Sequence, residues 1–128
     1  MLRPVNPQEL RQSWAFVRSG LEHILRKSPE QWIPEDVYAA VSNNRASLWL
    51  AIDNDMAVGF VIGYINGDNF HVWCAWGRLN GNLKRYFQEL EDIAKTQCKR
   101  ITFDTWRPGW NKVARELGFM PRSWAKEL

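Results

Sequence analysis

The stretch FHVWCAWGRLNGNLKRYFQELEDIAKTQCKRITFDTW, residues 70–106, decides the fold that this sequence predicts. It opens with an apolar strand, Phe70–Ala75, which breaks at Trp76-Gly77. Apolar residues then recur at helical spacing from Leu83 to about Thr96, and a second strand runs from Arg100 to Trp106. The glycine-containing turn before this helix presents backbone N–H groups at a helix N-terminus, where an anion is stabilised. Taken alone, one glycine there indicates only a turn.

Three strands precede and include the start of this stretch. They are Ala46–Ile52, Met56–Ile65 and Phe70–Ala75, separated by the turn-forming segments 53–55 and 66–69. Short turns between consecutive strands predict an antiparallel meander. Gly59 and Gly63 inside the second strand predict a bulge or a close approach of two backbones.

The segments before and after these strands are predicted to be mainly helical. A short strand over Met1–Val5 precedes a helix that runs from Pro7, with Asn6 as its N-cap, to Lys27, and a second helix opens at Pro34. A short helix also follows residue 109 and stops at Gly118-Phe119. The tail 120–128 forms either a last strand through its tryptophan or a loop.

Together these elements predict an α+β fold for residues 1–128 as a single domain. Its mixed central sheet combines the antiparallel meander with two βα units and carries helices on both faces. We expect strands 70–75 and 100–106 to be parallel neighbours whose carboxyl ends splay apart, joined by a right-handed crossover.

The amino-acid composition indicates a soluble globular protein and gives no sign of a membrane span or a zinc site. Apolar residues make up 45% and charged residues 24%, which is ordinary for a soluble globular protein, and no apolar run is long enough to cross a membrane. The net charge of +3 is compatible with an anionic partner or with a solvated surface alone. Cys74 and Cys98 have no zinc-binding spacing and no signal peptide precedes them, so we expect free thiols and a cytoplasmic location.

The turn and the two chain ends resemble the GNAT superfamily of N-acetyltransferases. That family's turn reads Gln/Arg-x-x-Gly-x-Gly/Ala, and here Arg78 and Gly81 match it while Leu83 departs from it. Leu117-Gly118-Phe119 matches the family's helix ending, and the opening Leu2-Arg3-Pro4-Val5-x-Pro7 resembles its first strand. The resemblance covers nearly the whole chain at the level of motifs.

The resemblance implies a site for coenzyme A, with acetyl-CoA as the acyl donor and no metal. Trp73, Cys74 and Ala75 would face the pantetheine arm. The turn would face the pyrophosphate through Arg78, Gly81, Asn82 and Leu83, and Arg107 stands where the family usually has asparagine and would contact a phosphate. The alternative for Arg78 and Gly81 is that of ordinary turn residues at the surface.

The same resemblance implies direct attack of an amine on the thioester, which requires a proton acceptor. His71 and Asp104 are the two candidate catalytic residues, although a packed strand histidine and a solvated carboxylate are the simpler interpretations. Ala114 lies where the family often has the tyrosine that protonates the departing thiolate, and alanine has no proton to donate. The sequence does not identify the amine acceptor.

Two other functions remain open at this stage. The first is a GNAT-like protein that has lost catalysis and binds a ligand or a protein partner, as in small divergent bacteriophage proteins of the host cytoplasm or the virion. The second is a single-stranded nucleic-acid binder with stacking tryptophans at 73, 76, 106 and 110 beside Arg78, Arg100 and Arg107. Nucleic acid is the less favoured partner, because four exposed tryptophans would form a costly apolar patch.

Overall fold

A computed structural model describes the whole chain except Trp106 and Pro108. Its centre is a five-stranded sheet in the order β1-β2-β3-β4-β5, formed by β1 (Leu2–Val5), β2 (Ser47–Asp53), β3 (Met56–Asn66), β4 (Asn69–Gly77) and β5 (Arg100–Phe103). Strands β1 to β4 pair antiparallel, and β5 joins β4 in parallel. The expected α+β mixed sheet, its meander and its parallel strand pair are thereby confirmed.

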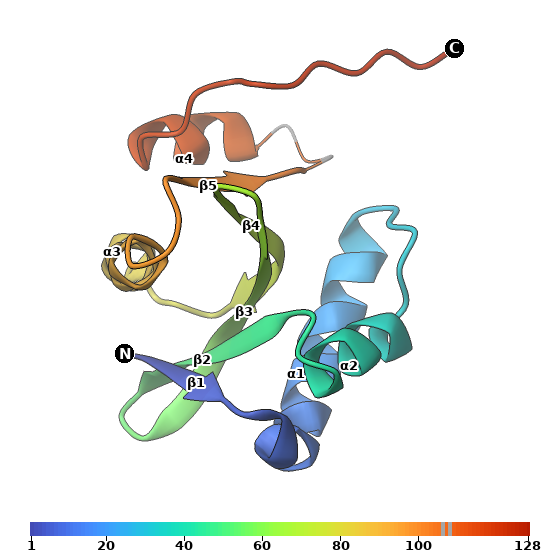
Figure 1. Cartoon of the computed structure of the whole chain (residues 1–128), viewed down its shortest axis with the longest axis vertical. Helices are drawn as coiled ribbons and strands as arrows, with labels where there is room; N and C mark the ends of the chain where they lie inside the picture. Colours follow the sequence, from blue (N-terminus) through green and yellow to red (C-terminus); the bar gives the residue numbers. More distant parts are fainter. Residues whose placement is uncertain (106, 108) are drawn as a thin grey trace.

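Helices cover both faces of the sheet, as predicted (Figure 1). A 3₁₀ turn, η1 (Pro7–Glu9), leads into α1 (Leu10–Lys27), and α2 (Pro34–Ser42) follows on the same face. Helix α3 (Leu83–Ala94) covers the opposite face, and α4 (Trp110–Glu116) lies beyond β5. Asn6 caps the first turn as expected, because its side chain accepts a hydrogen bond from the backbone N–H of Gln8 at 2.9 Å.

Each face of the sheet has its own apolar core. The core under α1 and α2 is centred on Val17, Leu21, Val37, Leu48 and Ile62, none of which is more than 1% exposed. The core under α3 is smaller and is built on Val61, Phe70, Leu90 and Ala94. This division follows the alternation of strand side chains between faces, with Val61 and Ile62 as adjacent examples.

The positions of the two β3 glycines confirm the prediction drawn from them. The β3–β4 register shifts next to Gly63, and the β2–β3 register shifts close to Gly59. A Cβ atom on Gly59 would lie 2.6 Å from the Trp76 carbonyl oxygen and 2.8 Å from Gly77 Cα. Only glycine therefore lets β3 and β4 approach so closely at the carboxyl end of β4.

Some predicted boundaries are wrong. The strand expected to break at Trp76-Gly77 continues through both residues, because they remain paired with Phe60 and Gly59. The strand expected over 100–106 ends at Phe103, where its pairing with β4 stops, and the last residue of that prediction lies outside the described part. The tail 120–128 forms no strand and is exposed throughout, and in Figure 1 it runs away from the body.

No helix in the described part of the chain is long and apolar enough to cross a membrane.

Candidate functional site

The parallel strands β4 and β5 pair only over their first halves. Their register runs from Asn69 opposite Arg100 to Val72 opposite Phe103. Strand β4 then continues to Gly77, while β5 has ended. Residues 73–77 therefore have no strand partner on the β5 side within the described residues. A cavity of about 510 Å³ opens at this point, lined from both faces of the sheet. Backbone N–H and C=O groups without a partner must bond to water or to a ligand.

A β-bulge redirects the side chains that β4 presents to the cavity. Cys74 pairs with Ile62 and Val72 pairs with Gly63, so Trp73 is the additional residue on β4. Because of the bulge, Trp73 and Cys74 both contribute to the core under α1 and α2, although they are consecutive. A side chain at Gly63 would meet the His71 carbonyl oxygen at 2.7 Å, so this bulge needs glycine on the opposite strand.

The turn between β4 and α3 forms the second part of the cavity wall. Asn80 and Gly81 both have positive φ angles, of 50° and 83°, and the N–H of Asn82 donates to the Leu79 carbonyl at 2.9 Å. This geometry is a type I′ turn, for which Asn-Gly is the preferred pair. Asn82 is the N-cap of α3, yet no side chain caps the helix. The first amides of α3 are thus without a capping partner, which suits an anion.

The ionisable residues around the cavity are few and of balanced charge. Among the described lining residues, the carboxylates are Glu30 and Asp104, and the cations are Lys27 and Arg107. His23 also lines the cavity, with its ring 5.9 Å from that of Trp76. No group of three or more potential metal ligands occurs in the part of the chain that the structure describes.

The two candidate catalytic residues lie together, although His71 is in β4 and Asp104 directly follows the end of β5. The Asp104 Oδ2 atom is 3.7 Å from His71 Nε2, and His71 Nδ1 is 2.8 Å from the hydroxyl of Thr102. The first distance fits an ion pair with a protonated imidazole and is too long for a hydrogen bond. The Asp104 side chain is 87% exposed and lines the cavity, whereas His71 stands behind it at 18% exposure.

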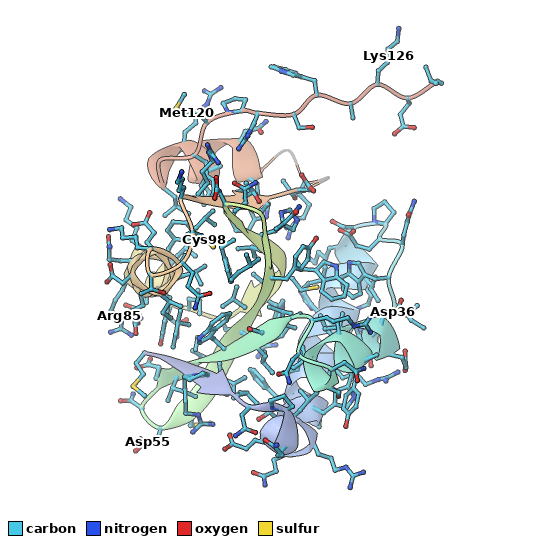
Figure 2. All side chains as sticks on the ribbon, in the orientation of Figure 1. Asp36, Asp55, Arg85, Cys98, Met120 and Lys126 are labelled. Atoms are coloured by element: carbon cyan, nitrogen blue, oxygen red, sulfur yellow. The ribbon has the colours of Figure 1, made fainter. Side chains whose placement is uncertain are left out.

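The thiol of Cys74 is held in its neutral form. Burial raises its pKa far above the usual thiol range, and the charge of Glu30 raises the pKa further. A thiol with a raised pKa is a poor nucleophile, so Cys74 serves the cavity as an apolar surface. Cys98 is also a free cysteine and belongs to the core under α3 (Figure 2).

The other predicted binding residues divide into two groups. The cavity is lined by several of them, namely Trp73, Cys74, Ala75, Gly81, Leu83 and Arg107. Arg78 and Asn82 lie outside this lining. The Arg78 guanidinium instead stands over the Trp76 ring, 5.9 Å from its centroid. Leu83, which departs from the family's turn pattern, also borders the cavity.

The tryptophans of β4 are packed and do not form an exposed stacking surface. Trp76 contacts the rings of Phe16 and Phe60, and Trp73 contacts those of Trp32 and Tyr64. Both are half-buried against the core under α1 and α2. The nucleic-acid interpretation needed these two side chains free for base stacking, so the packing removes its main support.

Sequence reasoning missed the cavity wall on the α1 side. His23 and Lys27 come from the end of α1, and Glu30 and Trp32 from the loop that follows it. No local pattern in the sequence links residues 23–32 to β4. Only the packing of α1 across the sheet brings them to the cavity.

Comparison with known proteins supports the fold and nothing finer. No family model matches the chain, and no curated protein matches its sequence. Solved structures do match it in shape. A probable acetyltransferase superposes with a TM-score of 0.72 at 14% identity, over 100% of this chain and 95% of that one.

Two further structures of similar shape are acetyltransferases of a stated type. The ribosomal-protein-alanine N-acetyltransferase of Brucella melitensis biovar Abortus 2308 has a TM-score of 0.71 at 12% identity, covering 100% of this chain and 96% of its own. An aminoglycoside N-acetyltransferase in complex with CoA has a TM-score of 0.61 at 17% identity, covering 100% and 97%. At these identities the similarity demonstrates a shared GNAT-like fold.

Proposed function

We propose that this protein is an N-acyltransferase that transfers an acyl group, such as acetyl, from coenzyme A to an amine. The observation that carries the proposal is the cavity where β4 and β5 separate, bordered both by the open edge of β4 and by the uncapped start of α3. The similarity in fold to acetyltransferases, one of them in complex with CoA, supports the same conclusion.

The residues present fit the shape and charge of coenzyme A. The peptide groups of 73–75 can bond to the amides of the pantetheine arm, as a strand partner would. Helix α3 begins at Leu83, directly after Gly81 and Asn82, and its first backbone amides suit the pyrophosphate. Arg107 adds a cation at the cavity, and Arg78 stands close to the turn.

The transfer is a direct displacement at the thioester carbonyl. The amine nitrogen forms a bond to the carbonyl carbon, the carbon–sulfur bond breaks, and the sulfur leaves as the thiolate of coenzyme A. Backbone N–H groups on the open edge of β4 donate to the carbonyl oxygen as negative charge develops there. The proton released by the amine goes to the Asp104 carboxylate, and water donates a proton to the thiolate. The hydroxide that remains takes the proton from Asp104, which restores the carboxylate.

His71 acts on this step through Asp104. It lies outside the cavity lining, with Nε2 3.7 Å from Asp104 Oδ2 and Nδ1 bonded to Thr102. At this distance the two side chains interact electrostatically without a hydrogen bond, and the imidazole favours positions of the exposed Asp104 carboxylate on the β4 side. We therefore assign His71 as a positioning residue and Asp104 as the proton acceptor.

A second candidate function is favoured by Ala114. This residue lies in α4 and has no group that can protonate a thiolate. A protein that binds coenzyme A or a related anion without turning it over would keep the open β4 edge and the α3 start but lose this group. The two functions therefore predict equal binding and different turnover.

Thiol release from acetyl-CoA with a panel of amines, beside direct titration with coenzyme A, tests the proposal. Asp104→Asn should lower the rate by about 100-fold or more without changing affinity for coenzyme A. His71→Gln should shift the pH profile of the rate. Asp55→Asn removes the same charge in the β2–β3 turn (labelled in Figure 2), at a residue that does not line the cavity, and should change neither quantity. Full activity of Asp104→Asn would refute its role, and no binding of coenzyme A would refute the proposed function.

A further inference from the structure

The geometry points to a specific class of acceptor: a primary amine with one positive charge on an aromatic or apolar body, bound on the α1 side of the cavity beside Glu30, Trp32 and Trp73. This acceptor site deepens the proposed acyl transfer and rests on it for its role in catalysis. The experiment below measures amine binding separately from coenzyme A binding.

Two tryptophans form the aromatic wall of this site. Trp32 comes from the loop before α2, and Trp73 is the bulged residue of β4. Their ring centroids are 6.4 Å apart at an interplanar angle of 74°, and both residues line the cavity while packing against the core. Tyr64 supports Trp73 from behind, with its ring 6.2 Å away. The aromatic rings are therefore fixed in position, and the parts of them that line the cavity offer apolar surface to a ligand.

Glu30 supplies the negative charge of the site. It is half-buried, and no hydrogen bond or ion pair joins its side chain to another residue in the described part of the chain. Its charge is also close enough to the Cys74 thiol to contribute to that group's raised pKa. A carboxylate that is partly removed from water, without a cation to pair with, favours binding of a cation. An ammonium group beside Trp32 would gain cation–π attraction as well.

The few charged side chains that line the cavity favour a ligand with a single ammonium group. Of the two carboxylates among the described lining residues, Asp104 approaches from the end of β5 and Glu30 from the loop after α1. Lys27 and Arg107 line the same cavity and would repel additional positive charges. A polycation such as sisomicin, bound to an aminoglycoside acetyltransferase of similar fold, would leave several charges unpaired here. A monoamine has one positive charge, which Glu30 can pair.

The site also suits the proposed chemistry. With the ammonium group held near Glu30 and the aromatic body against Trp32 and Trp73, the nitrogen lies between the loop after α1 and the open edge of β4. The bound ammonium group must lose one proton to water before its nitrogen can attack. Asp104, at the end of β5, is then available to accept the second proton, which the nitrogen loses as the amide forms. Glu30 is in this view a binding residue that selects the acceptor.

Calorimetric titration, with and without saturating coenzyme A, tests the inference with four probes: phenethylamine, propylamine, phenethyl alcohol and sisomicin. Phenethylamine should bind about tenfold more tightly than propylamine, because its ring buries against the tryptophans. It should also bind about tenfold more tightly than phenethyl alcohol, because it carries the charge. Sisomicin should bind more weakly than phenethylamine.

Variants assign this preference to the named residues. Glu30→Gln should weaken phenethylamine about tenfold or more and leave phenethyl alcohol and coenzyme A unchanged. Asp55→Asn, which removes a charge outside the cavity, should leave all probes unchanged. Trp32→Phe keeps an aromatic ring and should retain most of the affinity, whereas Trp32→Ala should lose it. Thermal unfolding of each variant shows whether the fold is kept, and if Trp32→Ala does not fold, the Glu30 variant decides alone.

The outcomes separate the two proposals. Tighter binding of sisomicin than of phenethylamine, or equal phenethylamine affinity in wild type and Glu30→Gln, would overturn the acceptor site while coenzyme A binding and thiol release leave the transferase intact. Preserved phenethylamine binding at Glu30 without any coenzyme A binding would refute the transferase and support the amine site alone.

Discussion

Gly81 offers the sharpest test of where the anionic part of the cofactor binds. Its φ of +83° belongs to the region that glycine adopts freely, and a Cβ atom built there would meet nothing within 4 Å. Substitution at Gly81 therefore strains the backbone without a steric clash. Asparagine and aspartate tolerate this conformation better than other residues and have almost the same shape. The pair Gly81→Asn and Gly81→Asp consequently shares its strain and differs in one negative charge.

That charge should act in opposite directions on folding and on binding. The added carboxylate lies just before α3, so in the free protein it should stabilise the aspartate variant relative to the asparagine variant by about 0.3–1 kcal/mol. If a pyrophosphate occupies the first amides of α3, the same carboxylate repels it and competes for those amides. The loss of one charge-assisted contact is worth about 1.5–3 kcal/mol, so coenzyme A should bind Gly81→Asp at least about tenfold more weakly than Gly81→Asn.

The assays are denaturant unfolding and calorimetric titration of both variants at two salt concentrations. The stability difference and the affinity difference should both shrink at higher salt, because both are electrostatic. Equal coenzyme A affinity in two folded variants would contradict the reasoning and would place the phosphates away from the α3 start.

Two further predictions follow from other residues: one concerns protonation of the departing coenzyme A thiolate, and the other concerns the buried thiol of Cys74. Ala114→Tyr should raise the rate of thiol release if coenzyme A already binds, and fast wild-type turnover that the tyrosine leaves unchanged or lowers would mean that the chain has another acid. Because the pKa of Cys74 is raised in the folded protein, the unfolded thiol ionises first, and stability should fall above about pH 8.5 by up to 1.36 kcal/mol per unit for this group. Cys74→Ala should remove that slope in denaturant unfolding measured between pH 8 and 10, Cys98→Ala should keep it, and an unchanged slope in Cys74→Ala would contradict the assignment.

Local patterns in the sequence predicted most of the fold because the elements depend on short-range signals. The turns 53–55 and 66–69 fixed the meander, and the glycines of β3 indicated its irregular pairing, which the structure confirms at Gly63 and close to Gly59. The end of β5 was less predictable. The run 100–106 has strand composition to its end, yet pairing stops at Phe103, because β4 and β5 separate there.

The cavity depends on contacts between residues far apart in the sequence, so the sequence predicted only the walls formed by β4 and the start of α3. The β4 and α3 walls are encoded within 73–83, so a motif can indicate them. The opposite wall comes from Glu30 and Trp32, which lie about forty residues earlier in the chain and are brought there by the packing of α1 on β3 and β4. The pairing of His71 with Asp104 likewise requires β4 and β5 to be in register, which sequence composition does not reveal.

In the proposed transferase, the early end of β5 would make coenzyme A binding and catalysis depend on different parts of the site. We expect the peptide groups of 73–77 that β5 leaves unpaired to bond to water in the free protein, so a ligand that replaced this water would break no bond within the sheet. In this proposal, binding depends mainly on backbone geometry set by the bulge at Trp73 and the turn at Gly81. In the proposed mechanism, turnover would depend instead on a few side chains, with Asp104 present and alanine at position 114. A chain of this design can lose catalysis by single substitutions and still bind coenzyme A, so affinity for coenzyme A tests the site, and only the rate of thiol release distinguishes an enzyme from a binding protein.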